Sequence, residues 1–460
     1  MTTFTKQMAL PVSCEEAFQW HERSGALDRL MPPWESVTLL QRGEDIDVGT
    51  QVVLKHRIGP FPIKWVAEHT EYVPGRLFRD VQRSGPFSKW DHLHRFEIDE
   101  ADGSAQPVLI DEVDYALPMG PIGRLLAGRF VRDKLETMFA FRHRVTLQDL
   151  LLHKICSPTP LHFAVTGSSG LVGSALCALL TTGGHQVTRM VRGEAQNDGE
   201  CFWDPSGQAA WGFPDETDVV IHLGGKNIAS GRWTDSRKRE MLESRVRGTT
   251  VLSEKLSESR SKPKTLIVAS AIGYYGDRGD QWLDEGSTKG DGFLSGLVQD
   301  WEASTALAED AGIRVVHARL GIVLSTKGGA LQKMLTPFRL GGGGRVGNGQ
   351  QYWSWISLND AISAMLYLAT NTDVSGPVNL VSPDVVTNGE FTAILAGVLR
   401  RPALLPAPAF LLRTVLGEMA DELLLASARV RPDVLTAQNY AFRDRELEQT
   451  LRWELGAVNG

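Results

Sequence analysis

The sequence predicts an α/β fold, in which a doubly wound parallel sheet with a small cap lobe follows an α+β domain. Two observations carry this prediction. From Leu161 onward, short apolar runs alternate with helical patterns, which is typical of a parallel sheet covered on both faces. Before about residue 150, alternating runs are separated by turn residues alone, which is typical of antiparallel strands. A chain of 460 residues is also too long for one ordinary core.

Composition excludes several classes of function. Hydrophobic residues make up 42% of the chain and charged residues 22%, as in ordinary globular proteins. A net charge of −7 provides no basic field for a phosphate backbone, so we expect no nucleic-acid partner. The four cysteines lie far apart, which indicates reduced thiols in the cytoplasm and no zinc site. We expect no signal peptide and no membrane span, because the most apolar late stretch, 408–430, is interrupted by charges. The sequence carries no signal for an oligomeric state.

The first domain, expected over residues 1–150, should form a curved antiparallel sheet wrapped around one long helix. A strand is predicted at Phe4–Leu10, and Ser13–Glu16 has the pattern of a capping box that opens a short helix. Five further strands are predicted, at Thr50–Ile58, Ile63–Tyr72, Leu77–Gln82, Trp90–Ile98 and Val108–Leu117. A helix is predicted from a spaced set of apolar residues, namely Leu125, Leu126, Phe130, Leu135, Met138 and Phe139.

This order of elements, together with the segment RSGPFSKWDHLHRFE, resembles the START-like (SRPBCC) helix-grip superfamily of ligand-binding domains. The resemblance implies that the first domain encloses a cavity and binds an apolar ligand. Within the segment, Trp90, His92, His94 and Phe96 alternate onto one strand face. The two histidines could be metal ligands, but no third ligand is evident nearby. We therefore expect a cavity-lining or packed strand face and no metal.

Residues 151–160 carry two prolines and are predicted to be a linker to a second domain over 161–460. This domain opens with LHFAVTGSSGLVG at 161–173, the pattern of a strand, a tight glycine turn and a helix. Gly167 permits the turn, Gly170 lets backbone N–H groups approach a pyrophosphate, and Gly173 lets the helix pack closely. The helix N-terminus adds free N–H groups and the positive end of the dipole. A Rossmann-type dinucleotide site is therefore predicted, with contacts from Gly167, Ser168, Ser169, Gly170, Leu171 and Val172.

The second predicted strand, His185–Met190, ends at Val191 and Arg192. Folds specific for NAD place an acidic residue here to bind the ribose hydroxyls. Arg192 instead offers a guanidinium, which suits the 2′-phosphate of NADP. We therefore predict NADP(H) as the cofactor; the alternative is that Arg192 is a solvated surface charge.

Three more buried strands are predicted, each followed by small or polar residues: Asp218–Leu223 before Gly224–Gly225, Thr265–Ala269 before Ser270, and Ile313–Ala318 before Arg319–Gly321. The carboxyl ends of parallel strands meet at one edge of the sheet, where α/β proteins bind ligands. The predicted cofactor contacts at this edge are Leu223, Gly224, Gly225 and Gly321.

Residues 161–452 resemble the extended short-chain dehydrogenase/reductases, and more narrowly their atypical epimerase-like family, often labelled nucleoside-diphosphate-sugar epimerase. The motifs that carry this resemblance are TGSSGLVG at 166–173, HLGGKNI at 222–228, GRWTDSRKREMLESRVRGT at 231–249, SAIGYYGDRGD at 270–280, PFRLGGGGRVGNGQQYWSWISLNDA at 337–361 and GEMADELLLAS at 417–427. The fusion to a START-like domain also resembles a known arrangement of this family. The resemblance implies a cap lobe at about 321–382 and 407–437.

The resemblance further implies a catalytic serine, tyrosine and lysine. Ser270 matches the serine region, but the Tyr-x-x-x-Lys pair should fall near 290–300, where neither residue type occurs. Tyr274 and Tyr275 are followed four residues on by arginine and glycine. Ser270, Tyr274 and Tyr275 are therefore the candidate catalytic residues. The alternatives are a strand-end serine bonded to the backbone and tyrosines that line the substrate pocket.

Three further positions are singled out by the resemblance. Arg245 lies where the family's helix often offers an asparagine to the active site, so it is a candidate for contact with a cofactor or substrate anion, or an exposed helix arginine. Trp353 and Trp355 either stack on a base or sugar or pack in the core. Asp360 corresponds to a structural acid at a helix start.

Two functional hypotheses follow. The first is an NADP-dependent oxidoreductase or epimerase that acts on a small or nucleotide-linked substrate. The second is a binding protein in which NADP(H) controls ligand capture without turnover, which the missing tyrosine–lysine pair favours.

Overall fold

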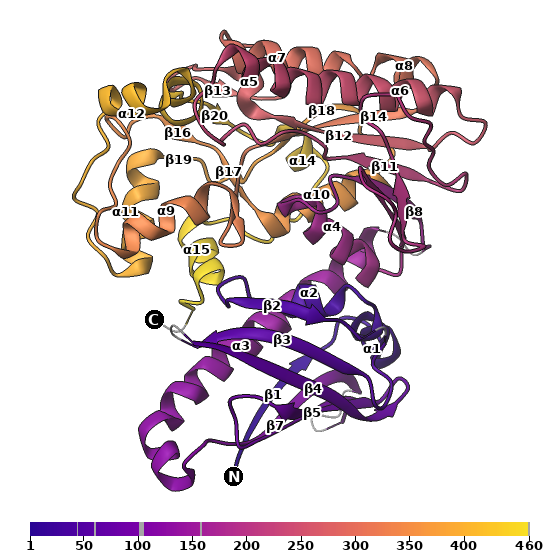
Figure 1. Ribbon diagram of the computed structural model, residues 1–460, viewed down its shortest axis with the longest axis vertical. Coiled ribbons are helices and arrows are strands. Elements are labelled where there is room, and N and C mark those ends of the chain that lie inside the picture. The colour runs from indigo at the N-terminus through magenta and orange to yellow at the C-terminus, as the bar shows by residue number, and fades with distance from the viewer. Residues whose placement is uncertain (44, 59–60, 101–104, 157–158, 459–460) are drawn as a thin grey trace. The chain divides into compact units, whose positions relative to one another are not determined.

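The structure, a computed structural model, describes residues 1–43, 45–58, 61–100, 105–156 and 159–458. The chain divides into two compact units (Figure 1). Unit 1 comprises Met1–Pro158, Ala178–Gly184 and Trp453–Gly460. Unit 2 comprises Thr159–Cys177 and His185–Arg452. Among the described helices, none combines the length and the apolar character that a bilayer span requires.

Unit 1 contains a seven-stranded antiparallel sheet of order β1-β7-β6-β5-β4-β3-β2. The strands are β1 (Thr2–Ala9), β2 (Val37–Gln41), β3 (Gln51–Ile58), β4 (Phe61–Val73), β5 (Leu77–Ser84), β6 (Lys89–Asp99) and β7 (Gln106–Ala116). The helices are α1 (Cys14–Glu22), α2 (Ala26–Leu30) and α3 (Gly120–Cys156). The predicted strands and the capping box of α1 are confirmed. Strand β2 was not predicted from the sequence; it is a short strand at the sheet edge in which no side chain is fully buried.

The long helix α3 packs on the sheet through its middle. Leu135 and Phe139 share a core cluster with Phe4, Trp90 and Tyr115 of the sheet, so the helix-grip arrangement is confirmed. The first turns of α3 are different, because the predicted apolar residues Leu125, Leu126 and Phe130 are exposed. The helix also continues to Cys156, six residues into the expected linker, since the side chains of Leu150 and Leu152 are buried.

Unit 2 contains a seven-stranded parallel sheet of order β10-β9-β8-β11-β12-β14-β18. Its strands are β8 (His162–Thr166), β9 (Gln186–Val191), β10 (Glu200–Phe202), β11 (Val219–His222), β12 (Thr265–Ala271), β14 (Arg314–Leu320) and β18 (Gly376–Leu380). The associated helices are α4 (Leu171–Thr182), α5 (Asp235–Leu242), η1 (Glu243–Arg247), α6 (Gly248–Glu258), η2 (Ile272–Tyr275), α7 (Phe293–Ala303), α8 (Ala306–Asp310) and α10 (Leu358–Thr370). Helices α6, α7 and α8 cover one face and α10 the other (Figure 1), which confirms the doubly wound fold.

Short paired strands and small helices form the cap. The pairs are β13 (Trp282–Leu283) with β20 (Arg429–Val430), β15 (Ile322–Ser325) with β17 (Trp355–Ser357), and β16 (Tyr352–Trp353) with β19 (Val386–Thr387). The remaining helices are α9 (Gly329–Arg339), α11 (Asn388–Leu399), α12 (Ala409–Leu416), α13 (Glu418–Ala420), η3 (Asp421–Leu425), α14 (Asp433–Ala437) and α15 (Leu447–Leu455). Strand β18, although inside the segment expected to form the cap, joins the main sheet because its second half is fully buried.

Three residues of the second unit pack inside it: Trp353 and Trp355, whose role the sequence left open, and Asp360, which was expected to be structural. Trp353 and Trp355 are buried, at 6% and 0% exposure, so they pack in the core and cannot stack on a ligand. Asp360, in the first turn of α10, is buried and accepts hydrogen bonds from the backbone N–H groups of Arg443 and Asp444. Burial and the neighbouring Asp444 raise the pKa of Asp360 to about 6. These contacts fix the chain segment that follows the cap.

Candidate cofactor and active site

The glycine turn after β8 has the geometry that the sequence predicts. Gly167 has φ +67°, and a Cβ added there would lie 2.7 Å from the Leu223 carbonyl oxygen. A Cβ on Gly173 would lie 2.2 Å from the Gly167 carbonyl oxygen, so the first turn of α4 lies against the loop. The Gly170 N–H donates to the Gly167 carbonyl at 2.9 Å. Only glycine fits at Gly167 and Gly173, as expected for a turn that brings a helix N-terminus to a pyrophosphate.

The predicted contacts of this turn differ in exposure. Ser168 is buried, Ser169 and Gly170 are exposed, and Leu171 and Val172 are half-buried. The first N–H groups of a helix have no partner within the helix, and α4 begins at Leu171. The turn therefore offers backbone donors at an accessible helix start, which fits a dinucleotide phosphate.

Arg192 follows the last residue of β9 and is exposed. Within the described part of the chain, its guanidinium pairs with no carboxylate and makes no hydrogen bond. β9 lies beside β8 in parallel register, with Met190 opposite Thr166. The cation is thus at the same sheet edge as the glycine turn, free for an anionic ligand.

Arg245 brings a second cation to this edge. It lies on η1, a π-helical turn of a kind that often marks functional sites. Its guanidinium carbon is 3.2 Å from the position of a Cβ on Gly225 and 5.0 Å from the centre of the Trp301 ring. Burial lowers the pKa of Arg245 to about 10, and its nearest hydrogen-bond acceptor is the Met241 carbonyl at 3.4 Å. The interpretation as an exposed helix arginine is therefore wrong, because the side chain is half-buried against the loop after β11.

His222, the last residue of β11, is a buried polar residue that sequence analysis did not single out. Its Nδ1 lies 2.7 Å from the Thr166 hydroxyl, so it ties β11 to β8 directly below the glycine turn. Burial lowers the pKa of His222 to about 4, and the charge of Arg245 acts in the same direction. The ring is therefore neutral and serves as a support for the loops above it.

Gly321 has a packing role. A Cβ there would lie 2.6 Å from the Ser354 carbonyl oxygen and 2.8 Å from a methyl group of Val381. Its N–H donates to the Leu380 carbonyl at 3.0 Å. The close approach of β14 to its neighbours explains the glycine without a ligand.

Ser270, at the end of β12, belongs to a buried ion-pair cluster. Its hydroxyl donates to Glu302 Oε1 at 2.6 Å. Arg319, from the end of β14, donates to the same carboxylate from Nε at 2.8 Å and from a terminal nitrogen at 2.7 Å. The bidentate pair raises the pKa of Arg319 above its ordinary value. Ser270 is thus bonded to a side chain, whereas the sequence alternative assigned it a backbone partner.

The two candidate tyrosines have different surroundings. Tyr275 is fully buried; its hydroxyl donates to Asn379 Oδ1 at 2.7 Å and accepts from Arg319 at 3.1 Å. Burial raises the pKa of Tyr275 to about 12, so the phenol stays protonated. Tyr274 is half-buried, its ring centre lies 3.6 Å from the Arg319 guanidinium carbon, and its hydroxyl makes no hydrogen bond to a described residue. Of the three predicted catalytic residues, Tyr274 alone keeps a hydroxyl free for a substrate.

Helix α7 occupies the segment where the tyrosine–lysine pair was expected. Leu294 and Ser295 are buried beneath the turn that carries the tyrosines, and the Ser295 hydroxyl donates to the Gly273 carbonyl at 3.0 Å. Glu422 accepts hydrogen bonds from the N–H groups of Phe293 and Leu294, which caps the helix. The helix therefore supports the turn and carries Glu302, but it brings neither a tyrosine nor a lysine to the edge.

Sequence analysis missed Glu302 and Asn379, and it named Arg319 only as a strand-end residue. Glu302 is 32 residues from Ser270 and Asn379 is 104 residues from Tyr275. A signal was available for Arg319, since it ends a buried strand at the ligand edge. None was available for its partners, because they come from other elements.

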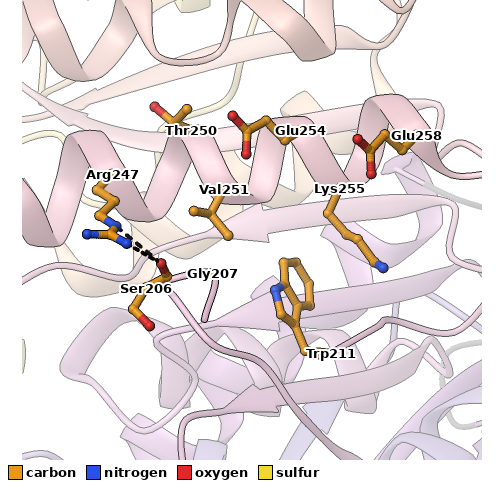
Figure 2. A pocket seen from close by; sticks show the side chains of 9 residues that line it. All are labelled: Ser206, Gly207, Trp211, Arg247, Thr250, Val251, Glu254, Lys255 and Glu258. Atoms are coloured by element: carbon orange, nitrogen blue, oxygen red, sulfur yellow. Dashed lines mark hydrogen bonds between the residues drawn. The ribbon is translucent and has the colours of Figure 1, made fainter. Parts of the chain in front are cut away.

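A separate groove of about 540 Å³ lies between α6 and the loop after β10 (Figure 2). Arg247 donates to the Ser206 carbonyl at 2.6 Å across it, and the Lys255 ammonium lies 6.0 Å from the centre of the Trp211 ring. None of the predicted cofactor or catalytic residues lines this groove.

A second buried polar cluster lies inside unit 1. His92 and His94 of β6 and Asp111 of β7 are buried, and Asp80 of β5 faces both histidines. His143 of α3 lies 2.6 Å from the far oxygen of Asp111. The expectation that no third metal ligand stands near the histidine pair is therefore wrong, because the neighbouring strand supplies a carboxylate from 12 positions earlier in the chain.

Comparisons with known proteins give the following matches. Residues 163–380 match the family described as "NAD dependent epimerase/dehydratase family", residues 10–141 match "Polyketide cyclase / dehydrase and lipid transport", and residues 407–454 match a domain of unknown function. The chain is 42% identical over 291 residues to an epimerase family protein of Mycobacterium leprae, covering 63% of this chain and 94% of that protein.

Solved structures give further matches. A nucleoside-diphosphate sugar epimerase from Corynebacterium glutamicum is 33% identical, with a TM-score of 0.80 over 98% of this chain and 90% of that chain. A human epimerase family protein, solved with NADPH, is 33% identical, with a TM-score of 0.60 over 64% of this chain and 99% of that chain.

Proposed function

Because the chain belongs to the epimerase family, as its motifs predicted, and is a nicotinamide-dinucleotide-binding Rossmann protein, we propose that it is an NADP(H)-dependent oxidoreductase or epimerase. Its substrate is proposed to be a small molecule, polar or linked to a nucleotide. The observation that carries the cofactor choice is Arg192, an exposed guanidinium at the end of β9 that pairs with no carboxylate among the described residues. The similarity to a human family member solved with NADPH supports the same choice.

Two arginines at this edge of the parallel sheet would then each bind a different part of the cofactor. Arg192 would bind the 2′-phosphate, whereas Arg245, beside the Gly224–Gly225 loop, would face the pyrophosphate or a substrate anion. Arg245 is half-buried and pairs with no carboxylate of the residues that the structure describes, which is costly unless an anion joins it. The glycine turn would supply backbone donors to the phosphates.

When bound, a nicotinamide cofactor accepts or supplies a hydride, so the chain's own residues must move a proton. Tyr274 is the proposed proton carrier, because its hydroxyl makes no hydrogen bond to any residue that the structure describes. The Arg319 guanidinium over its ring would stabilise negative charge that develops on the phenol oxygen. Arg319 would thus replace the lysine of the Tyr-x-x-x-Lys pair, which is absent near residues 290–300, and its bidentate bond to Glu302 would hold it in place.

The experiment has two steps on the full chain. NADPH and NADH are titrated by fluorescence, and cofactor consumption is then measured against a panel of carbonyl compounds and nucleotide sugars. We expect Tyr274→Phe to keep NADPH affinity and to lower turnover by about 10²–10⁴-fold, the usual range for a general acid–base group. Tyr352→Phe is the matched control, since an arginine carbon also lies over that ring, at 4.5 Å from its centre. Turnover that survives Tyr274→Phe unchanged contradicts the assigned role.

The second candidate function is NADP(H)-gated ligand binding without turnover. The observation that favours it is that the hydroxyls of Ser270 and Tyr275 are already bonded to protein groups, and that α7 carries neither a tyrosine nor a lysine. Tight NADPH binding with no consumption on any substrate would support this candidate over the enzyme.

We further propose that unit 1 binds an apolar small molecule, with support from its match to the lipid-transport family model. Binding of a fluorescent fatty acid to the full chain, and its displacement by competing lipids, tests this. Absence of saturable binding would refute it.

A further inference from the structure

We propose that the interior of unit 1 holds a divalent transition-metal ion, coordinated by Asp80, His92 and His94. One potential ligand atom of each of these residues lies within 4.8 Å of the others. Asp80 Oδ1 is 3.5 Å from His92 Nδ1 and 3.9 Å from His94 Nε2. Ligand atoms around a tetrahedral ion with bonds of about 2.0–2.1 Å are roughly 3.3 Å apart, so small side-chain rotations would close the set on a metal.

The register of the antiparallel sheet places the ligands together. Asp80 of β5 is directly opposite His92 of β6, and His94 is directly opposite Asp111 of β7. His92 and His94 are two positions apart on one strand, so their side chains share the inner face. The arrangement is thus built into three neighbouring strands, whose backbones restrain it more than a loop would.

Asp111 orients both imidazole rings as an outer carboxylate does in metal sites. Its Oδ1 lies 3.0 Å from His92 Nε2 and 2.7 Å from His94 Nδ1. In each ring, therefore, one nitrogen faces Asp111 and the other faces Asp80. Metal-binding histidines usually direct the nitrogen away from the metal to a carboxylate, which fixes the ring and its tautomer. His143 Nε2, at 2.6 Å from Oδ2, holds Asp111 in turn.

The hydrogen bonding of the cluster is incomplete without a further partner. The imidazole nitrogens that face Asp80, His92 Nδ1 and His94 Nε2, lie 3.5 and 3.9 Å from its carboxylate, farther than in a charge-assisted hydrogen bond. Nδ1 of His69, which is opposite Asp80 on β4, is buried without a hydrogen bond to a described residue. Buried polar atoms of this kind are rare in native proteins and call for an explanation such as an ion.

Charge and packing agree with a cation at this position. The cluster contains two carboxylates, Asp80 and Asp111, and the charge of Arg142 interacts with both. The ring of Phe78 stacks on His94 with ring centres 4.1 Å apart, which closes one side of the site. The side chain of Asp80 is 19% exposed, so its carboxylate is in contact with solvent.

The donor set selects the class of metal. Two imidazoles and one carboxylate suit zinc, cobalt or iron(II), whereas calcium and magnesium require oxygen ligands. Three protein ligands leave at least one position open for water or for an oxygen atom of a ligand. The ion would thus give the interior of unit 1 a polar anchor for one end of a bound molecule.

The experiment uses the full chain, stripped with a chelator and then supplied with Zn²⁺ or Co²⁺ alone. We expect about one equivalent of metal by mass spectrometry, and a visible Co²⁺ absorption band of nitrogen and oxygen ligands without a thiolate charge-transfer band. Asp80→Asn and His94→Gln should each weaken binding more than 100-fold, and Asp111→Asn about 10–100-fold. His56→Gln, which removes a histidine on β3 that lies 3.4 Å from Glu35, is the control and should bind normally.

Metal uptake far below one equivalent in the unmodified chain would overturn the proposal. So would a thiolate band, or uptake that is unchanged in both Asp80→Asn and His94→Gln. Circular dichroism and NADPH binding verify that each variant is folded. If a variant does not fold, the Co²⁺ spectrum of the unmodified chain alone tests whether nitrogen and oxygen ligands bind the metal.

Discussion

Each of the two units buries a cluster of charged and polar side chains. The clusters differ in whether their members satisfy one another's hydrogen bonds. In unit 2, Glu302 accepts from Ser270 and twice from Arg319, and Arg319 also donates to Tyr275. The Tyr275 hydroxyl then donates to Asn379. Because these donors and acceptors satisfy one another, we call this group the closed cluster. It holds α7 to the ends of β12, β14 and β18.

In unit 1 the hydrogen bonds do not close in this way. Asp111 serves three imidazoles, and the second nitrogens of His92 and His94 both face the single carboxylate of Asp80. A fully satisfied buried network rigidifies a fold, whereas a partly satisfied one is costly. Burial and charge alone therefore do not identify a ligand-binding site. Buried polar atoms that face a common position without short hydrogen bonds do.

The largest effect is expected from breaking the closed cluster. Arg319→Met leaves the Glu302 carboxylate buried without its partner, and we expect a loss of about 3–5 kcal/mol in the free energy of unfolding. Arg413→Met is the matched control, because Arg413 is bonded to Asp421 at 2.8 Å but is 57% exposed. Its expected cost is at most about 1 kcal/mol. Urea unfolding measures the free energy of unfolding of both variants. Equal losses would show that the closed cluster stabilises the fold no more than an exposed ion pair does.

A smaller, pH-dependent effect is expected at His222, which is buried and, unlike His92, pairs with no carboxylate in the described part of the chain. Its pKa is about 4 in the folded state and about 6.5 when unfolded. Between these values the unfolded chain binds more protons, so the folded state loses stability as pH falls from about 6.5 to 4. The shift corresponds to about 3 kcal/mol at most.

The measurement compares the unmodified chain with His222→Asn at pH 7 and pH 5. Asparagine can place an amide near the position of Nδ1 and keep the bond to Thr166, but it does not titrate. We expect the variant to lose less stability on acidification than the unmodified chain. An identical loss in both would mean that burial at this position does not suppress protonation.

The local part of the cofactor site could be predicted from the sequence. The turn at Gly167–Gly173 is contiguous, and every constraint on it, from the positive φ of Gly167 to the close approach of Gly173, involves residues nearby in the chain or the next parallel strand. Short apolar runs likewise locate buried strands. The helix α3 was predicted from its pattern, but the pattern did not show that its first turns, with Leu125 and Phe130, are exposed.

The two buried clusters could not be predicted, because they depend on strand register and on helix placement. His92 and Asp111 are separated by 19 residues and meet across β6 and β7, whose register fixes which carboxylate faces which ring. The β4–β5 pair contains an irregularity between His69 and Glu71, which no periodicity argument reveals. A one-residue shift would turn Asp80 to the other face of the sheet.

Arg192 differs from both buried clusters, because it is an exposed cation whose unsatisfied N–H donors point to solvent. We expect Arg192→Asp to weaken NADPH binding about 10–100-fold, the loss of one to two charge-assisted contacts, and to improve the relative affinity for NADH. Arg401→Asp makes the same charge change at another exposed position and should leave both affinities unchanged. Fluorescence titration measures the two cofactors side by side. Unchanged NADPH affinity in Arg192→Asp would remove the 2′-phosphate assignment.

The smallest effect separates the two neighbouring tyrosines. Tyr275→Phe removes a hydroxyl that bridges Asn379 and Arg319, so we expect a loss of about 1–2 kcal/mol in the free energy of unfolding. NADPH affinity should stay the same, because Tyr275 is fully buried within the closed cluster. Tyr274→Phe should have the reverse profile, with stability kept and turnover lost, since its hydroxyl bonds no described residue. If both variants lose stability to the same extent, the hydroxyl of Tyr274 also belongs to the closed cluster, and the edge of the sheet has no free proton carrier.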